Sequence, residues 1–164
     1  MSKKQYFAFK AEADGRVKEL RTEAFITFPS LLDNRSFVDK NVIKISAIWD
    51  TGATNSVITQ KFIDELGLKP TGIVPTFTAG GIKNCPTYYI DLGLPNRIVI
   101  PNLVVTGNDQ LTSCDMLIGM DVICRGDFAI ANAKGRTHFS FCMPPHDTPI
   151  CLYEKTLKVN KRAK

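Results

Sequence analysis

The feature that most constrains this chain is a single acidic residue at the end of an apolar strand pattern. The pattern over residues 42–49 alternates in character, reaches Asp50 and breaks at Gly52. One face of the predicted strand carries Ile43, Ile45, Ala47 and Trp49. Desolvating an acid at such a position costs free energy. An acid is therefore expected there only where a partner offsets the cost or where function requires the acid. Taken alone, Asp50-Thr51-Gly52 is more typical of an ordinary turn, in which the aspartate hydrogen-bonds its own loop.

The length and composition are those of one soluble globular domain. The chain has 164 residues, of which 44% are hydrophobic and 23% charged. No apolar run approaches the roughly 20 residues that a membrane-spanning helix needs. The basic N-terminus has no apolar segment behind it. We therefore expect neither a membrane span nor a signal peptide.

The cysteines and histidines argue against disulfides and metals. The 5 cysteines are scattered, without a Cys-x-x-Cys pair. This pattern indicates reduced thiols in a cytoplasmic protein rather than a disulfide framework or a zinc site. The two histidines, His138 and His146, do not have metal-ligand spacing. The sequence thus predicts no metal, no histidine-based catalysis and a cytoplasmic location.

The positive charge is concentrated at the C-terminus. The formal net charge is +5. The last ten residues alone account for it through Lys155, Lys158, Lys161, Arg162 and Lys164. A basic segment of this kind is typical of a mobile, solvated end. A nucleic-acid-binding domain would carry its cations on the folded body, among aromatics. We expect residues 151–164 to be a mobile basic tail and nucleic acid not to be a partner.

Short strand patterns separated by turns fill the rest of the chain. Residues 5–28 form a predicted hairpin around Asp14-Gly15, the strongest short hairpin signal in the sequence. Residues 29–40 have the composition of a loop. Thr59 is expected to cap a two-turn helix that Gly67 ends. Further strands are predicted at 73–78, 87–92, 97–100, 103–106, 128–131 and 136–141.

Residues 115–123 are predicted to begin as a buried strand and to continue as a second short helix. Turn signals recur every 8 to 12 residues, and no repeat or low-complexity linker interrupts them. The predicted fold is a mostly β, closed barrel with two short helices, in a single domain over residues 1–150.

Three motifs occur in an order that resembles the retropepsin-like aspartic proteases, the clan of the retroviral proteases. Asp50-Thr51-Gly52-Ala53 comes first, after apolar residues and shortly before Ser56. The hairpin tip Thr78-Ala79-Gly80-Gly81 follows about thirty residues later, where this family has its flap. Leu117-Ile118-Gly119 resembles the apolar-apolar-glycine signature that lies beside the catalytic turn. The extension over residues 120–123 is similar to the cellular and bacterial single-domain branch. The resemblance covers residues 40–141.

The resemblance implies an acid-protease-type barrel and assigns roles to particular residues. Asp50 is the expected catalytic residue, with Thr51 bracing the partner subunit and Gly52 letting backbone approach the site. Gly119 is the expected structural glycine beside it. Substrate contacts are expected from Ala53, Ala79, Gly80, Gly81 and Ile118. No cofactor is implied.

Aspartic proteolysis uses two carboxylates that share one proton. The sequence has one Asp-Thr/Ser-Gly motif, and the chain is too short for a two-lobed enzyme. A homodimer would supply the second Asp50 by symmetry. The expected function is an aspartic endopeptidase that acts on peptides or proteins.

Two other classes of function fit parts of the sequence. One is a catalytically silent dimerisation or peptide-binding module with the same barrel. The other is a nucleic-acid-associated protein that uses its basic tail, which would show a steep salt dependence of binding.

Overall fold

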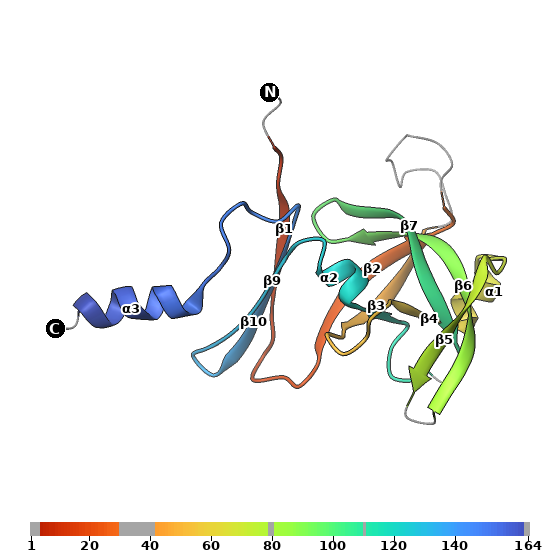
Figure 1. Cartoon of the computed structure of the whole chain (residues 1–164), viewed down its shortest axis with the longest axis horizontal. Helices are drawn as coiled ribbons and strands as arrows, with labels where there is room; N and C mark the ends of the chain where they lie inside the picture. The colour runs from red at the N-terminus through yellow and green to blue at the C-terminus, as the bar shows by residue number, and fades with distance from the viewer. Residues whose placement is uncertain (1–3, 30–41, 79–80, 110, 163–164) are drawn as a thin grey trace.

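The computed structural model, which describes residues 4–29, 42–78, 81–109 and 111–162, shows a mostly β protein built on a closed barrel (Figure 1). Its strands are β1 (Phe7–Glu12), β2 (Leu20–Thr27), β3 (Ile43–Trp49), β4 (Val57–Thr59), β5 (Gly72–Thr78), β6 (Gly81–Leu94), β7 (Ile98–Asn108), β8 (Met116–Ile118), β9 (Asp127–Ala133) and β10 (Arg136–Met143). Its helices are α1 (Gln60–Glu65), α2 (Met120–Ile123) and α3 (Leu152–Arg162).

Six strands form the barrel. Their order is β2-β3-β8-β4-β7-β6, and β6 pairs back with β2, so that the sheet closes on itself. The fold class predicted from the sequence is therefore confirmed. β5 extends β6 as a hairpin outside the ring. The barrel interior is filled by fully buried aliphatic side chains: Ile26, Ile58, Ile90, Leu92, Ile98, Ile100, Leu103, Val105, Met116 and Ile118.

A second sheet, in the order β1-β10-β9, packs against the barrel through Trp49. The indole ring lies 5.0 Å from the ring of Phe141, 5.1 Å from Phe139 and 5.6 Å from Phe128. Its Nε1–H donates to the Thr22 hydroxyl at 2.9 Å, which satisfies the buried polar atom. Trp49 is the last residue of β3, so this aromatic cluster fixes the backbone immediately before Asp50.

The predicted N-terminal hairpin is wrong. The strands β1 and β2 exist, but β1 pairs with β10 and β2 pairs with β3 and β6. The segment around Gly15, which has a φ of +115°, continues toward β10 instead. Ala13 N–H donates to the Thr137 carbonyl at 2.9 Å, and Thr137 N–H donates to the Gly15 carbonyl at 2.9 Å. The Asp14-Gly15 pair bends the chain without joining its two flanking strands.

Both helices predicted inside the barrel region are present, as α1 and α2. Gly67, with a φ of +61°, follows α1 as expected for a residue that ends a helix. Thr59 occupies the N-cap position, yet its side chain makes no capping hydrogen bond. The predicted cap is therefore wrong in its chemistry, although the helix begins where expected.

The C-terminal segment contains a third helix, α3, that the sequence did not predict. Figure 1 shows it projecting beyond the three-stranded sheet, and its residues 152–161 are all exposed. Its exposed apolar side chains include Leu152, Tyr153 and Val159. The mobility of the tail and the domain boundary at residue 150 stay predictions. No helix in the described part of the chain is long and apolar enough to span a membrane.

Candidate active site

Asp50 is placed by the pairing of β3 with β8. These two short strands run parallel, with Ile48 opposite Leu117 and Trp49 opposite Ile118. One further backbone hydrogen bond extends the β3–β8 pairing to Asp50, whose N–H donates to the Ile118 carbonyl at 2.9 Å. The residue is half-buried. Within the described ranges no cation forms an ion pair with Asp50, so this carboxyl is not part of a structural salt bridge.

The residues after Asp50 fold into a tight turn around its carboxyl group. Gly52 N–H donates to Asp50 Oδ1 at 2.8 Å, and Ala53 N–H donates to the Asp50 carbonyl at 3.2 Å. A Cβ atom at Gly52 would lie 3.2 Å from Asp50 Oδ1, closer than most such contacts. Thr51 and Gly52 are both exposed. The turn therefore leaves Thr51 and Gly52 at the surface, next to the half-buried Asp50.

A buried polar network behind the turn joins it to the start of α2. The fully buried Ser56 hydroxyl donates to Asp121 Oδ1 at 2.8 Å and accepts from Gly119 N–H at 3.1 Å. Ser56 N–H donates to Asp121 Oδ2 at 3.0 Å. Asp121 was not among the predicted site residues. The signal that could have indicated it is an acid two positions after the glycine of the apolar-apolar-glycine motif.

The backbone of α2 also bonds directly to the turn. Met120 N–H donates to the Ala53 carbonyl at 2.8 Å, and Asp121 N–H donates to the Thr54 carbonyl at 3.2 Å. Gly119 makes this approach possible because a Cβ there would lie 2.7 Å from the backbone carbon of Asn55. The sequence-predicted neighbours Asp50, Thr51, Gly52, Ala53 and Gly119 are thus brought together.

Comparison with known proteins bears on this arrangement. A family model described as "gag-polyprotein putative aspartyl protease" matches residues 38–125, more than half of the chain. The chain belongs to this aspartyl protease family. The match spans both the Asp50 turn and Gly119. The resemblance to retropepsin-like proteases is thereby confirmed. A search of curated proteins gave no significant match.

Three solved structures are similar to this chain. A retropepsin-like aspartic protease from Rickettsia conorii has 17% sequence identity and a TM-score of 0.54, with 87% of this chain and 99% of that chain covered. EIAV protease complexed with the inhibitor HBY-793 has 17% identity and a TM-score of 0.45, covering 65% of this chain and 86% of that one. The retroviral protease-like domain of Ddi1 from Leishmania major has 16% identity and a TM-score of 0.39, covering 70% and 82%. The Rickettsia structure shows that this member of the aspartyl protease family shares the retropepsin-like fold.

The prediction for Ile118 needs correction. Its side chain was expected to line a substrate pocket, but it is fully buried in the core of the barrel. Side chains alternate along a strand, so the neighbouring Leu117 points to the other face and is half-exposed. Leu117, opposite Ile48 on β3, is the residue that β8 presents outward.

The hairpin expected to form the flap is the β5–β6 hairpin. Ala79 and Gly80 lie outside the described residues. Gly81 begins β6, pairs with Thr78, is exposed and has a φ of +108°. That φ is one that residues with a side chain rarely adopt.

An open hollow of about 500 Å³ lies beside the candidate active site. Thr51 and Met120 line one part of it, whereas Phe128, Pro149 and Ile150 line another. Residues next to the Asp50 turn therefore share a surface depression with the segment that leads into α3. The sequence did not predict this juxtaposition.

The Ser56 network yields a prediction for stability. Ser56→Ala removes the acceptor of the buried Gly119 N–H and one donor to Asp121. We expect the free energy of unfolding to fall by about 1–3 kcal/mol, because a buried polar group is left without its partner. Urea denaturation measures this change. Ser140→Ala, at an exposed position on β10, is the control and should change stability by less than about 0.5 kcal/mol. Equal effects in the two variants would contradict the role of Ser56.

Proposed function

We propose that this protein is an aspartic endopeptidase whose active site forms between two copies of the chain, each contributing Asp50. One observation carries the proposal. In a member of an aspartyl protease family, the single Asp-Thr-Gly turn holds a half-buried carboxyl that forms no ion pair with any described residue, and Ser56, Gly119 and Asp121 brace the turn from behind. An ordinary turn does not need that buried support.

The chemistry requires both carboxylates. Two carboxyl groups about 3 Å apart cannot both ionise, so the pair holds one proton. The ionised Asp50 takes a proton from a water molecule, which attacks the scissile carbonyl. The protonated Asp50 of the other subunit hydrogen-bonds that carbonyl and later supplies a proton. Each chain has one such motif, so a two-fold axis beside the Asp50 turn would bring the pair together.

The surroundings of Asp50 fit this arrangement. Thr51 is exposed and available to contact the partner subunit across the axis. The Gly52 carbonyl and Ala53 would meet the backbone of an extended peptide. The tip of the β5–β6 hairpin, with Ala79, Gly80 and Gly81, would cover the bound peptide. The peptide would pair with the hairpin as an added strand. Leu117 takes the apolar-contact role first assigned to Ile118.

A peptide-library cleavage assay across pH tests the proposal. We expect cleavage to follow a bell-shaped pH profile, because activity requires one protonated and one ionised carboxyl in the pair. The optimum is expected on the acidic side of neutral. A pepstatin-type transition-state mimic should inhibit cleavage and shift the protein to a dimer in sedimentation. A chain that stays monomeric with the mimic present, or that cleaves with a flat pH profile, would contradict the shared dyad.

The flap assignment leads to a second test. Gly81→Val places a branched side chain at a φ of +108°, and we expect kcat/KM to fall more than the folded fraction does. Gly135→Val is the matched control, because Gly135 is also an exposed glycine at positive φ with open space around it, at the β9–β10 turn. The control should lose stability alone. Activity per folded molecule and melting temperature are measured on both variants. If Gly81→Val loses stability but keeps normal activity per folded molecule, the hairpin is not a lid.

A cytoplasmic location is also proposed. All five cysteines are free, and three of them (Cys85, Cys114 and Cys142) are buried. Free buried thiols of this kind are typical of proteins in a reducing compartment.

A further inference from the structure

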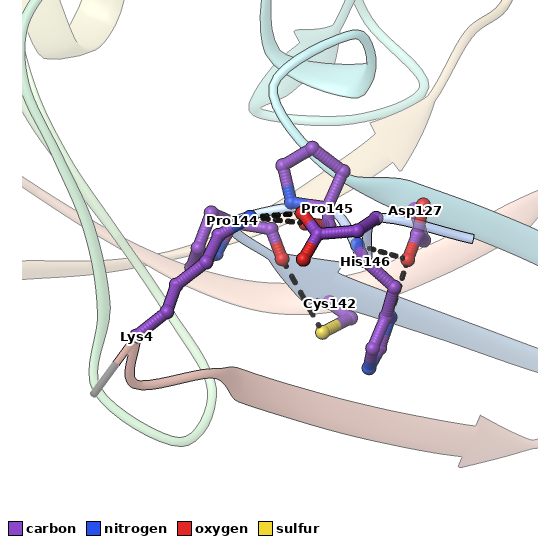
Figure 2. Close-up of polar contacts among 7 residues, drawn as sticks. Lys4, Asp127, Cys142, Pro144, Pro145 and His146 are labelled. Atoms are coloured by element: carbon purple, nitrogen blue, oxygen red, sulfur yellow. Dashed lines mark hydrogen bonds and ion pairs between the residues drawn. The ribbon is translucent and has the colours of Figure 1, made fainter. Parts of the chain in front are cut away.

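Three side chains with metal-ligating atoms meet where the second sheet ends. Asp127 begins β9, Cys142 lies near the end of β10, and His146 follows in the next loop. One ligand atom from each lies within 4.8 Å of the other two. Figure 2 shows Asp127 beside His146, with the Cys142 sulfur below Pro144 and Pro145. This cluster was not predicted from the sequence, because it forms through strand pairing, in which Cys142 lies opposite Asp127.

The histidine is held in place by several contacts. The backbone N–H of His146 donates to Asp127 Oδ2 at 2.9 Å, and the ring nitrogen Nδ1 of His146 lies 2.5 Å from the same oxygen. Tyr6 stacks on the imidazole ring, with centroids 4.7 Å apart and planes at 7°. Lys4 fixes the adjoining loop through the Pro145 carbonyl at 3.0 Å and Asp147 at 3.1 Å. The loop is thus anchored to the N-terminal segment on one side and to β9 on the other.

The thiol and the carboxylate oppose each other electrostatically. Burial raises the pKa of the Cys142 thiol, and the Asp127 charge raises it further. Cys142 is 7% exposed and its sulfur donates to the Pro144 carbonyl at 3.6 Å. A divalent cation would favour the thiolate instead, because its charge would balance the negative charges of the thiolate and of Asp127. The thiolate would become a ligand of the cation, and the thiol proton would leave to solvent.

We propose that Asp127, Cys142 and His146 bind a zinc ion, with solvent in the fourth position. A mixed set of thiolate, imidazole and carboxylate ligands is typical of zinc, whereas magnesium and calcium take oxygen ligands. With metal–ligand distances near 2 Å, tetrahedral coordination needs about 3.3 Å between the imidazole nitrogen and the carboxylate oxygen. The 2.5 Å contact therefore has to open by under about 1 Å, which the half-exposed His146 side chain allows.

The zinc site would organise the segment beside the candidate active site. Asp127 is one of the residues that line the 500 Å³ hollow beside the candidate active site, as Thr51 also does. Pro149 and Ile150, which follow His146 in the chain, line the same hollow. Fixing His146 to β9 and β10 would hold that wall of the hollow in position. The metal site does not depend on the proposed proteolytic activity, and its test does not use it.

Cobalt substitution in the full chain tests the proposal. The reduced protein is stripped with EDTA and titrated with Co²⁺, and thiolate coordination is followed by the near-ultraviolet charge-transfer band. We expect the band to saturate at one Co²⁺ per chain and to disappear when Zn²⁺ is added. Cys142→Ser should abolish the band, whereas Asp127→Asn and His146→Gln should weaken Co²⁺ binding at least about tenfold. Bound Zn²⁺ should also raise the melting temperature of the wild-type chain.

Cys124→Ser is the matched control. Cys124 is exposed at the end of α2 and lies outside the cluster, so the band should remain unchanged. Circular dichroism checks that each variant is folded; serine at position 142 is close in size to cysteine and is not expected to unfold the chain. The proposal is overturned if the wild type shows no band, if Cys142→Ser keeps it, or if Cys124→Ser loses it. The first outcome would leave Asp127 and His146 as a simple hydrogen-bonded pair.

Discussion

Asp50→Asn is expected to abolish peptide cleavage while leaving the fold intact. The amide cannot take the proton from water, and in a homodimer the substitution removes both members of the pair at once. We expect kcat/KM to fall by about 10²–10⁴-fold or more, the contribution of a general acid–base group. The side-chain oxygen of asparagine can still accept the Gly52 N–H. The free energy of unfolding should therefore change by less than about 0.5 kcal/mol.

The control for this variant is Asp64→Asn, on the exposed surface of α1. It should retain full activity. Wild-type turnover by purified Asp50→Asn would rule out the mechanism. If the wild-type chain binds peptides and dimerises but cleaves nothing, the protein is instead the silent dimerisation or peptide-binding module that the same barrel could provide.

Local patterns in the sequence predicted the elements that carry the site. Three of these patterns involve only residues that are close in the sequence, and all three elements appear in the structure. They are the alternation that ends at Trp49, the apolar residues 116–118 and the turn between β9 and β10. The same local patterns do not indicate which strands pair when those strands are far apart in the sequence. Phe7 lies opposite Met143, and this pairing displaced the local hairpin that Asp14-Gly15 indicated.

The interactions missed in the sequence depend on three-dimensional proximity. Ser56 and Asp121 are 65 positions apart and meet only because β4 lies antiparallel to β8. The apolar-apolar-glycine motif predicts a strand at residues 117 and 118 but does not indicate which side chain points inward, so the prediction of a pocket role for Ile118 was wrong. Burial decides that question, since Ile118 fills the barrel. The sequence did not indicate α3 because its residues 152–161 are all exposed, so the helix has no buried face to leave an apolar pattern.

Gly119→Ala is expected to impair both stability and the proposed cleavage, because it fills the space through which α2 approaches the Asp50 turn. The φ of Gly119 is −89° and its ψ is −173°, a conformation open to alanine, so the effect is steric. The added Cβ would lie 2.8 Å from the Asn55 carbonyl oxygen and 2.9 Å from that of Ala53. Backbone atoms cannot rotate away, so the turn has to shift. We expect a loss of about 1–3 kcal/mol in the free energy of unfolding. A displacement near 1 Å at Asp50 would lower kcat/KM by about 10²-fold.

Gly107→Ala is the matched control for this steric argument. A Cβ at Gly107 would approach Ile63 Cδ1 at 2.7 Å and Tyr88 Cε2 at 2.9 Å, a similar overlap with side chains instead of backbone. Those side chains can adjust, and neither belongs to the Asp50 turn. We therefore expect Gly107→Ala to lose stability while its activity per folded molecule stays normal. Urea denaturation and kcat/KM, corrected for the folded fraction, are measured on both variants. If Gly119→Ala also kept normal activity per folded molecule, the close approach of α2 would not be what positions Asp50.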